Sequence, residues 1–428
     1  MNKKLIATTT TTLIALGIAA WAGLAYSTGG KVEEALRSMA APAPDAAAAS
    51  AWRVADLEHA RGVLASSGQF RVIYEDGEDR LPFLVTYSVD HKALPASAAS
   101  FSWKLQPEGP LAADLKSTAG TDVQVTGTGT IAYSGSVSSD FQLPAVSTRS
   151  EGRSLSITAS TGTARYDDTR LEAQWTLDQL TMRGKGEALE VRGTKVSFDV
   201  DHATGSQALA RLSVDRIDTA VGSFEGLDLT AESRRNADRM DTTVSQSLRR
   251  IEAMGQAFSD LQLKWEVNGL HAESLEKLVL LAQHSGDSMS LTLKERLAAA
   301  EAIETLLNKG FSFGMPTLTG KGRDGGVEAS FKITLAAAQG EQTALADRVQ
   351  SSGTASVKGA LLSPEQVEMA TNSGFAVTQG DTLTTGYQYA RGLLKVNDRE
   401  LDASFIDAAL FRADEQLQVL LSSMKTQR

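Results

Sequence analysis

Three glycines in the C-terminal third of the chain have the spacing of a nucleotide-binding loop. Gly320, Gly322 and Gly325 match the pattern G-x-G-x-x-G, which in a dinucleotide site follows a strand and opens a helix whose N-terminus faces the pyrophosphate. Residues 327–335 instead alternate apolar and polar side chains, as a half-buried strand does. We therefore interpret these glycines as a hairpin turn and expect no cofactor.

The five histidines do not form a recognisable metal site. No two of them have a zinc-binding spacing, and the chain has no cysteine to complete a ligand set. Two of them end a Val-Asp-His triplet that follows an alternating segment, where Asp and His are ordinary strand-ending residues. We expect no metal site from this set, which comprises His59, His91, His202, His271 and His284.

Acidic and nucleophilic residues also lack a catalytic arrangement. Asp199 and Asp201 lie two positions apart on one predicted strand, which places both carboxylates on the same face. Solvated positions on a polar face explain them better than a general acid and base. The chain has no Gly-x-Ser-x-Gly nucleophile motif. The sequence therefore predicts no catalytic residues, and we expect a protein that is not an enzyme.

Composition sets further limits on the function. The chain has 428 residues, of which 42% are hydrophobic, and this is ample for a packed core. Its net charge is -10, with no basic cluster beyond short pairs such as Arg234-Arg235, which argues against nucleic acid as a partner. Because there is no cysteine, the fold must be stabilised without disulfides.

An uncharged run from Leu5 to Tyr26 follows Lys3 and Lys4. A helix of that length spans a hydrocarbon core of roughly 30 Å, and the basic flank favours a cytoplasmic N-terminus with an exported body. The small residues around Ala22 also offer a signal-peptidase site. We favour a transmembrane signal anchor over cleavage, because the run is long and contains Trp21 and Tyr26 at interfacial positions.

This reading divides the chain into four parts. Residues 1–4 are a cytoplasmic segment, 5–26 the anchor, 27–50 an Ala-, Pro- and Gly-rich tether, and 51–428 the exported body, with a sub-boundary near residue 270 as one option. Ala51 to Ser66 has an irregular apolar face, which predicts a helix at the start of the body.

A period of two dominates the body from residue 69 onward. In the clearest example, Leu261, Leu263, Trp265 and Val267 alternate with Gln262, Lys264, Glu266 and Asn268. Strands with one polar face are typical of antiparallel sheets, and short links with turn residues connect them. We therefore predict a mainly β (α+β) fold, an extended antiparallel meander of about ten or more strands. Its sheet would be curled or folded over to cover the apolar faces.

Helical signals are few and come late in the chain. Residues 272–283 and 293–309 have apolar side chains at helical spacing, and Gly310 ends the second segment. Ser363 and Gln366 form a capping-box pattern around Pro364, with Gly374 as the stop. A further helix over 405–422 would dock on the sheet.

Several short segments, taken together, resemble the bacterial YdgA family. They are a basic N-terminus before a single span, Ser27 to Glu33, Val89 to Pro95, Gly226 to Ser233, the Trp265-centred strand that leads into Gly269-Leu270, and Tyr387 to Asn397. Directly after the last segment, Asp398 stands where the family is expected to have Gly. This family was catalogued as a domain of unknown function. The resemblance implies a Gram-negative inner-membrane protein that faces the periplasm, and it supplies no catalytic residues.

Two functions remain open at this point. In the first, the apolar sheet faces close on each other, and the protein is a structural or protein-interaction component of the envelope, as a homo-oligomer or with another protein. In the second, the faces leave a groove that binds lipid or another hydrophobic ligand. The residues that would line such a groove are Trp103, Trp175 and Trp265, which all lie on the apolar side of their strands.

Overall fold

The computed structural model describes residues 52–426, apart from gaps at 63, 77–78, 92–96, 120–121, 151–152, 185–186, 202–203, 254–255, 286–291 and 340–343. The predicted anchor (5–26) and tether (27–50) lie outside the described residues. The chain divides into one compact unit that ends at Ala220 and a second that begins at Val221. The optional boundary near residue 270 instead falls inside the second unit, where a strand that ends at His271 continues directly into a helix from Ala272.

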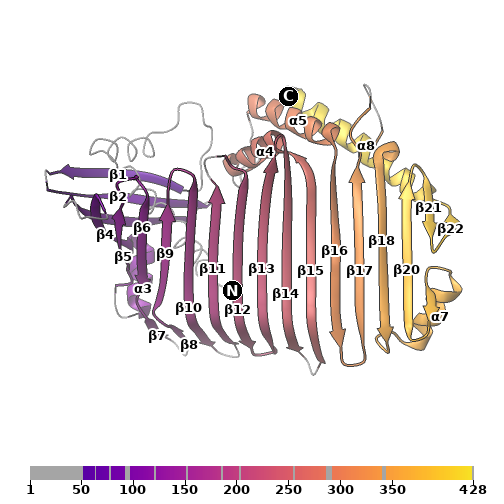
Figure 1. Ribbon diagram of the computed structural model, residues 1–428, viewed down its shortest axis with the longest axis horizontal. Helices are drawn as coiled ribbons and strands as arrows, with labels where there is room; N and C mark the ends of the chain where they lie inside the picture. Colours follow the sequence, from indigo (N-terminus) through magenta and orange to yellow (C-terminus); the bar gives the residue numbers. More distant parts are fainter. Residues whose placement is uncertain are drawn as a thin grey trace. The chain divides into compact units, whose positions relative to one another are not determined.

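The first unit is an antiparallel sheet with one helix among its described residues (Figure 1). Its strands pair in the order β1-β2-β3-β4-β5-β6-β9-β10-β11-β12, and the β7–β8 hairpin joins β10 through β8. The elements are β1 (Trp52–Arg61), β2 (Ala65–Asp76), β3 (Asp79–Asp90), β4 (Ala99–Pro107), α3 (Gly109–Ala119), β5 (Val125–Ile131), β6 (Val137–Leu143), β7 (Val146–Ser150), β8 (Arg153–Ile157), β9 (Ser160–Tyr166), β10 (Arg170–Gly184), β11 (Glu187–Asp201) and β12 (Gln207–Thr219).

The apolar face of the first unit closes into a core. β1 and β2 run across the direction of β10 and β11 (Figure 1), and one cluster of buried side chains links these strands. Phe70, Val72 and Ile131 are almost inaccessible to solvent. They belong to the same cluster as Trp103 and Trp175. Burial alternates strictly along β4 and β6, as the period of two predicts. This half of the sheet is therefore curled, as expected.

The predicted helix over Ala51 to Ser66 was wrong, because this segment is β1 and the start of β2. Asp56 has a positive φ of 52° and lies at an irregularity in the pairing of β1 with β2. Such a residue shifts the alternation, so Val54 and Leu57, three positions apart, both pack against the core. Apolar residues at a spacing of three also occur on helices, which explains the error.

The second unit is a long antiparallel sheet, with α4, α5 and α8 along one end of its strands and α7 at the opposite end (Figure 1). The strands pair in the order β13-β14-β15-β16-β17-β18-β20, and β19 and β21 pair with different halves of β20. The elements are β13 (Gly222–Asn236), β14 (Arg239–Ala253), β15 (Gln256–His271), α4 (Ala272–Ser285), α5 (Leu293–Lys309), β16 (Phe311–Gly322), β17 (Gly325–Leu335), α6 (Leu345–Arg348), β18 (Val349–Gly359), α7 (Pro364–Asn372), β19 (Val377–Gln379), β20 (Thr382–Ala390), β21 (Leu393–Val396), β22 (Arg399–Leu401) and α8 (Ser404–Lys425).

The four helices that the sequence predicts in this unit begin and end close to the predicted residues, whereas the four-residue α6 was not predicted. α5 ends at Lys309 before Gly310, and Ser363 caps α7 through the expected capping box with Gln366. The last predicted helix is α8, which packs on α5 and α6, while Ile406 and Leu410 also contact the buried Tyr389 and its neighbours. The sequence reading missed α3. The prediction of a mainly β, antiparallel fold with its helices mostly in the C-terminal part is confirmed.

Candidate functional site

An aromatic cluster lies on one side of the second unit's sheet. The ring of Trp265 in β15 stacks on Phe313 in β16 at a centroid distance of 5.5 Å, and Phe331 in β17 meets both rings edge-on at 5.9 and 5.8 Å. Offset and edge-to-face pairs of this kind are favourable. We call this side the apolar face, which consists of Phe258, Leu261, Leu263, Trp265, Val267, Phe313, Val327, Ala329, Phe331 and Ile333.

A backbone irregularity keeps this face continuous. A methyl group added at Gly320 would lie 2.7 Å from Leu261, and one added at Gly322 would lie 3.5 Å from Phe258. Gly320 and Gly322 are two residues apart on one strand and so face the same side. Phe258 and Leu261 therefore share a face although they are three positions apart. Asp260 between them has a positive φ of 53°, which shifts the alternation at this point.

The apolar face of the second unit is only half-covered. Phe258, Phe313 and Ile333 are 37%, 36% and 39% exposed, whereas most large apolar side chains of β2 to β6 in the first unit are buried in its core. In the first unit, Phe198 on β11 is exposed to the same degree, at 37%. Helices α4 and α5 contact β15, and α6 contacts β17; α4 and α5 lie at one end of the strands (Figure 1). The described elements therefore leave large apolar side chains open to solvent along the middle of the sheet.

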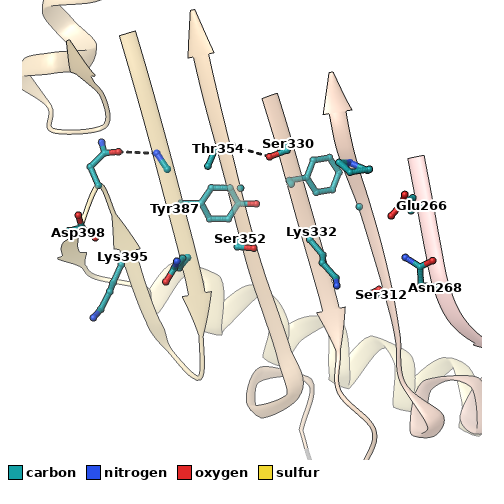
Figure 2. A pocket seen from close by; sticks show the side chains of 17 residues that line it. Glu266, Asn268, Ser312, Ser330, Lys332, Ser352, Thr354, Tyr387, Lys395 and Asp398 are labelled. Carbon is teal, nitrogen blue, oxygen red and sulfur yellow. Dashed lines mark hydrogen bonds between the residues drawn. The ribbon is translucent and has the colours of Figure 1, made fainter. Parts of the chain in front are cut away.

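The opposite face of the same strands holds a polar hollow of about 660 Å³ (Figure 2). Side chains from β15 to β18, β20 and β21 line it, and they include four hydroxyl groups, several amides and both signs of charge. Its polar lining comprises Glu266, Asn268, Ser312, Ser330, Lys332, Ser352, Thr354, Gln388, Lys395, Asn397 and Asp398. Each of the two faces therefore offers a surface of distinct chemistry.

Hydrogen bonds fix part of the hollow's lining. Ser330 and Thr354 share a hydrogen bond of 2.9 Å, and Asn397 accepts one from the Gly386 backbone N–H at 2.9 Å. Glu266 pairs with Lys264 at 2.6 Å, and the hydrogen bond from Lys264 holds the pKa of Glu266 below its usual range. Glu266 therefore stays ionised at the margin of the hollow.

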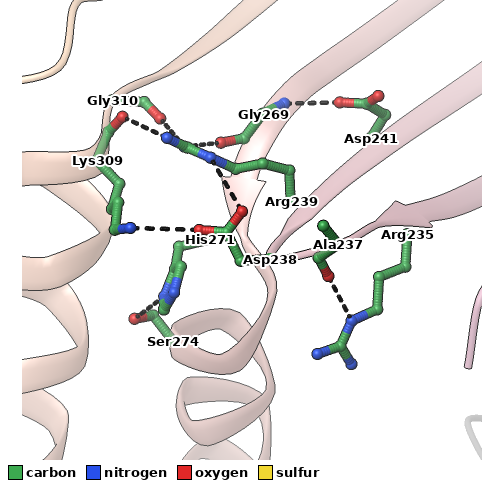
Figure 3. A network of polar contacts seen from close by, with 10 residues as sticks. All are labelled: Arg235, Ala237, Asp238, Arg239, Asp241, Gly269, His271, Ser274, Lys309 and Gly310. Atoms are coloured by element: carbon green, nitrogen blue, oxygen red, sulfur yellow. Dashed lines mark hydrogen bonds and ion pairs between the residues drawn. The ribbon is translucent and has the colours of Figure 1, made fainter.

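A polar network joins the strand ends to helix α5 (Figure 3). Arg239, at the start of β14, donates to the carbonyl oxygens of Gly269, Gly310 and Lys309 at 2.6, 2.9 and 3.0 Å. Lys309 also pairs with Asp238 at 3.3 Å and lowers the pKa of that carboxyl group. Carbonyl groups at a helix C-terminus have no partner within the helix, so the network has a structural role.

The structure separates the three tryptophans that the sequence offered as groove residues. Trp103 and Trp175 are 4% and 8% exposed in the closed core of the first unit. Their indole N–H groups donate to Ser139 and Ser160, each at 3.0 Å. They are core residues and line no open groove. Trp265 alone of the three lies in the aromatic cluster of the apolar face.

Several of the other residues considered for chemistry have local partners, while His202 lies outside the described residues. His59 and His91 bond to Tyr87 and Ser66, and the carboxylate of Asp199 pairs with Arg170, whose hydrogen bond lowers its pKa. Gly322 and Gly325 flank the β16–β17 turn, as the hairpin interpretation requires. Within the part of the chain that the structure describes, no group of His, Asp and Glu side chains could hold a metal ion.

Comparison with known proteins identifies a family. Residues 1–365 match the profile of a family described as bacterial protein of unknown function (DUF945). The chain belongs to the DUF945 family. This agrees with the YdgA-like resemblance of the sequence. The match covers the first unit and β13 to β18 of the second, so the apolar face lies within the DUF945 region. Searches of curated proteins and of solved structures found no match.

In this DUF945 chain, no helix among the described parts of residues 52–426 combines the length and hydropathy needed to cross a membrane.

The sequence analysis did not identify the polar hollow, because it interpreted Glu266 and Asn268 as ordinary solvent-exposed positions on the polar face of a strand. Period-two parity places them on the polar side, but only the pairing of six strands brings them into one hollow with Lys332 and Lys395.

Proposed function

We propose that this protein is a non-enzymatic binding protein of the bacterial cell envelope that holds an apolar molecule, such as a lipid acyl chain, on the apolar face of its second unit. The observation that carries this proposal is the half-open aromatic cluster of Trp265, Phe313 and Phe331. Fully burying one large apolar side chain contributes about 1.5–3 kcal/mol, so covering several half-exposed ones stabilises a bound chain.

The shape of the face supports an elongated ligand. β15, β16 and β17 are 16, 12 and 11 residues long, and a strand rises about 3.3 Å per residue. The apolar side chains recur along all three strands, from Phe258 to Val267 on β15 and from Val327 to Ile333 on β17. A linear hydrocarbon chain could contact this face over much of its length, whereas a compact ligand would cover only part of it.

Lipid analysis of the purified protein tests this proposal. Full-length protein is extracted from membranes, purified and treated with organic solvent, and the released lipids are identified by mass spectrometry. We expect near-stoichiometric lipid in the unmodified protein and at least a fivefold loss in the Trp265→Glu and Ile333→Glu variants. Gln262→Glu, on the polar side of β15, is the matched control. Lipid-free protein, or equal retention in all variants with circular dichroism unchanged, would refute the proposal.

The location is part of the same proposal. The uncharged run from Leu5 to Tyr26 after two lysines supports an inner-membrane anchor with the body in the periplasm. Alkaline phosphatase fused after Arg428 should be active, and the protein should remain in the membrane fraction after a carbonate wash. An inactive fusion would place the body in the cytoplasm. Release of a shortened protein would indicate cleavage near Ala22 instead of an anchor.

A second candidate function is contact with another protein through the C-terminal elements. Beyond the DUF945 match, α7 to α8 expose large apolar side chains at Met369, Phe375, Phe405, Phe411 and Val419, each between 56% and 69% accessible. Exposed apolar side chains of this kind suit a protein interface. If the purified protein is free of lipid and forms a defined oligomer, and if the Phe405→Glu variant is monomeric, this function is favoured over lipid binding.

A further inference from the structure

The polar hollow of Figure 2 has a lining that suits a different class of ligand. We propose that it binds an oligosaccharide, a ligand whose hydroxyl groups both donate and accept hydrogen bonds. This site lies on the polar face of the second unit's sheet and goes beyond the proposed function, since it does not depend on whether the apolar face binds lipid.

Strand register builds the hollow. One row of residues runs directly across six strands, and each residue in it pairs with the next one on the neighbouring strand. The row consists of Glu266, Gly314, Lys332, Ser352, Gln388 and Lys395. A neighbouring row brings Ser330, Thr354 and Gly386 side by side. Adjacent strands lie about 4.8 Å apart, so polar groups recur at short, regular intervals across the hollow, which suits the closely spaced hydroxyls of linked sugar rings.

Two glycines form the floor. A methyl group at Gly314 would lie 2.6 Å from the Phe331 carbonyl oxygen, so close packing requires glycine there. Gly386 is different: its φ lies outside the left-handed region, and the nearest atoms to an added methyl group would be 3.8 Å away. Neither backbone conformation nor packing requires glycine at 386. The missing side chain leaves room above the floor of the hollow.

The charges favour a neutral polyol over an anion or a metal ion. The charge of Lys332 acts on Glu266, whose pKa it helps to lower after the larger effect of Lys264, and Lys395 pairs only loosely with Glu400, at 3.5 Å. Glu266 and Asp398 line the same hollow and would repel a phosphate group. Two carboxylates among several amides and hydroxyls are too few ligands for a metal cage. The volume of about 660 Å³ is typical of a ligand site.

Neutral tetrasaccharides test the proposal on the purified full-length protein. Maltotetraose, cellotetraose and chitotetraose are titrated by calorimetry and by saturation-transfer NMR, with inorganic phosphate as the comparison probe. We expect at least one tetrasaccharide to bind, and its affinity to fall tenfold or more in Gly386→Val, which fills the hollow, and in Gln388→Leu, which removes an amide. Glu328→Gln, an exposed change on the same face of β17 outside the hollow, should bind as the unmodified protein does.

Three outcomes overturn this inference: no tetrasaccharide binds, only phosphate binds, or both hollow variants keep full affinity while circular dichroism shows an intact fold. The Trp265→Glu variant separates the two proposals, because it should lose lipid and keep saccharide binding. Lipid-free protein that still binds a tetrasaccharide would refute the proposed function alone, and lipid-loaded protein that binds none would refute this inference alone.

Discussion

At the scale of single residues, positive φ angles inside strands decide which side chains share a face. Gly193 in β11 has a φ of 62°, and the apolar positions of this strand change parity around it, from Leu189 and Val191 to Val196. Asp260 has the same role in β15. Because such residues interrupt the period of two, a sequence reading that assumes strict alternation fails next to them, as it did at Asp56.

Replacing Gly193 tests this role. An added methyl group would lie 2.0 Å from the Asp215 carboxylate. The alanine would also have to keep the left-handed backbone conformation of Gly193, which costs about 1–2 kcal/mol for a residue with a side chain. We expect Gly193→Ala to lower the free energy of unfolding by about 2–3 kcal/mol, and Asp215→Ala in the same chain to restore part of the loss. Urea unfolding followed by tryptophan fluorescence measures both changes.

Gly205 provides the control, because its φ is 60° and an added methyl group would meet no atom within 4 Å. Gly205→Ala should show the backbone cost alone. Equal losses at Gly193 and Gly205, with no recovery from Asp215→Ala, would mean that the contact with Asp215 is not significant.

At the scale of elements, signals contained within a few residues were readable from the sequence. The capping boxes of α5 and α7 satisfy helix-end N–H groups locally, so at α7 the pattern Ser363-Pro364-Glu365-Gln366 was enough to predict its start. Helix α3 begins at Gly109 after Glu108, without a Ser, Thr, Asp or Asn to mark its start. It was missed for that reason.

Tyr389 links β20 to α8 and makes this contact dependent on pH. Its side chain is 3% exposed and donates to Asp407 at 2.7 Å. Burial, together with the bond to Asp407, raises the pKa of Tyr389 to about 12, above the ordinary value of about 10. The folded state thus favours the protonated phenol, so this stabilisation is complete below pH 10 and is lost as the pH rises from 10 to 12.

Tyr389→Phe should remove this alkaline transition. We expect the unmodified protein to lose up to about 3 kcal/mol between pH 10 and 12, and the variant to be less stable at pH 8 but flatter over the alkaline range. Chemical unfolding at several pH values measures the effect, with the exposed Tyr133→Phe as the control. The same alkaline loss in Tyr389→Phe as in the unmodified protein would assign the effect to other groups.

At the scale of the whole molecule, the two units use the same strand pattern in different ways. The sequence predicted one-sided strands for both, and this was sufficient for the fold class. It could not show that the first unit buries Trp103 and Trp175, whereas the second leaves Phe313 and Ile333 exposed. That difference depends on curvature and on where the helices pack, which are set by long-range contacts that no local pattern encodes.

The polar hollow illustrates the same limit. Parity placed Glu266 and Lys332 on polar faces of their strands, but the row that joins them to Lys395 depends on the register of six strands. Register is fixed by pairing across turns and loops of different length. A reading of one sequence therefore identifies the polar face but not the site on it.

The central claim is that the apolar face of the second unit binds lipid, and site-specific photocrosslinking in cells tests it most directly. A photoreactive phenylalanine derivative is placed at Ile333, on the apolar face of β17, or at Glu328, on the polar face of the same strand. After irradiation, the purified protein is analysed by mass spectrometry for lipid adducts. The account predicts adducts at position 333 and none at position 328; no adduct at 333, or equal adducts at both positions, would contradict it.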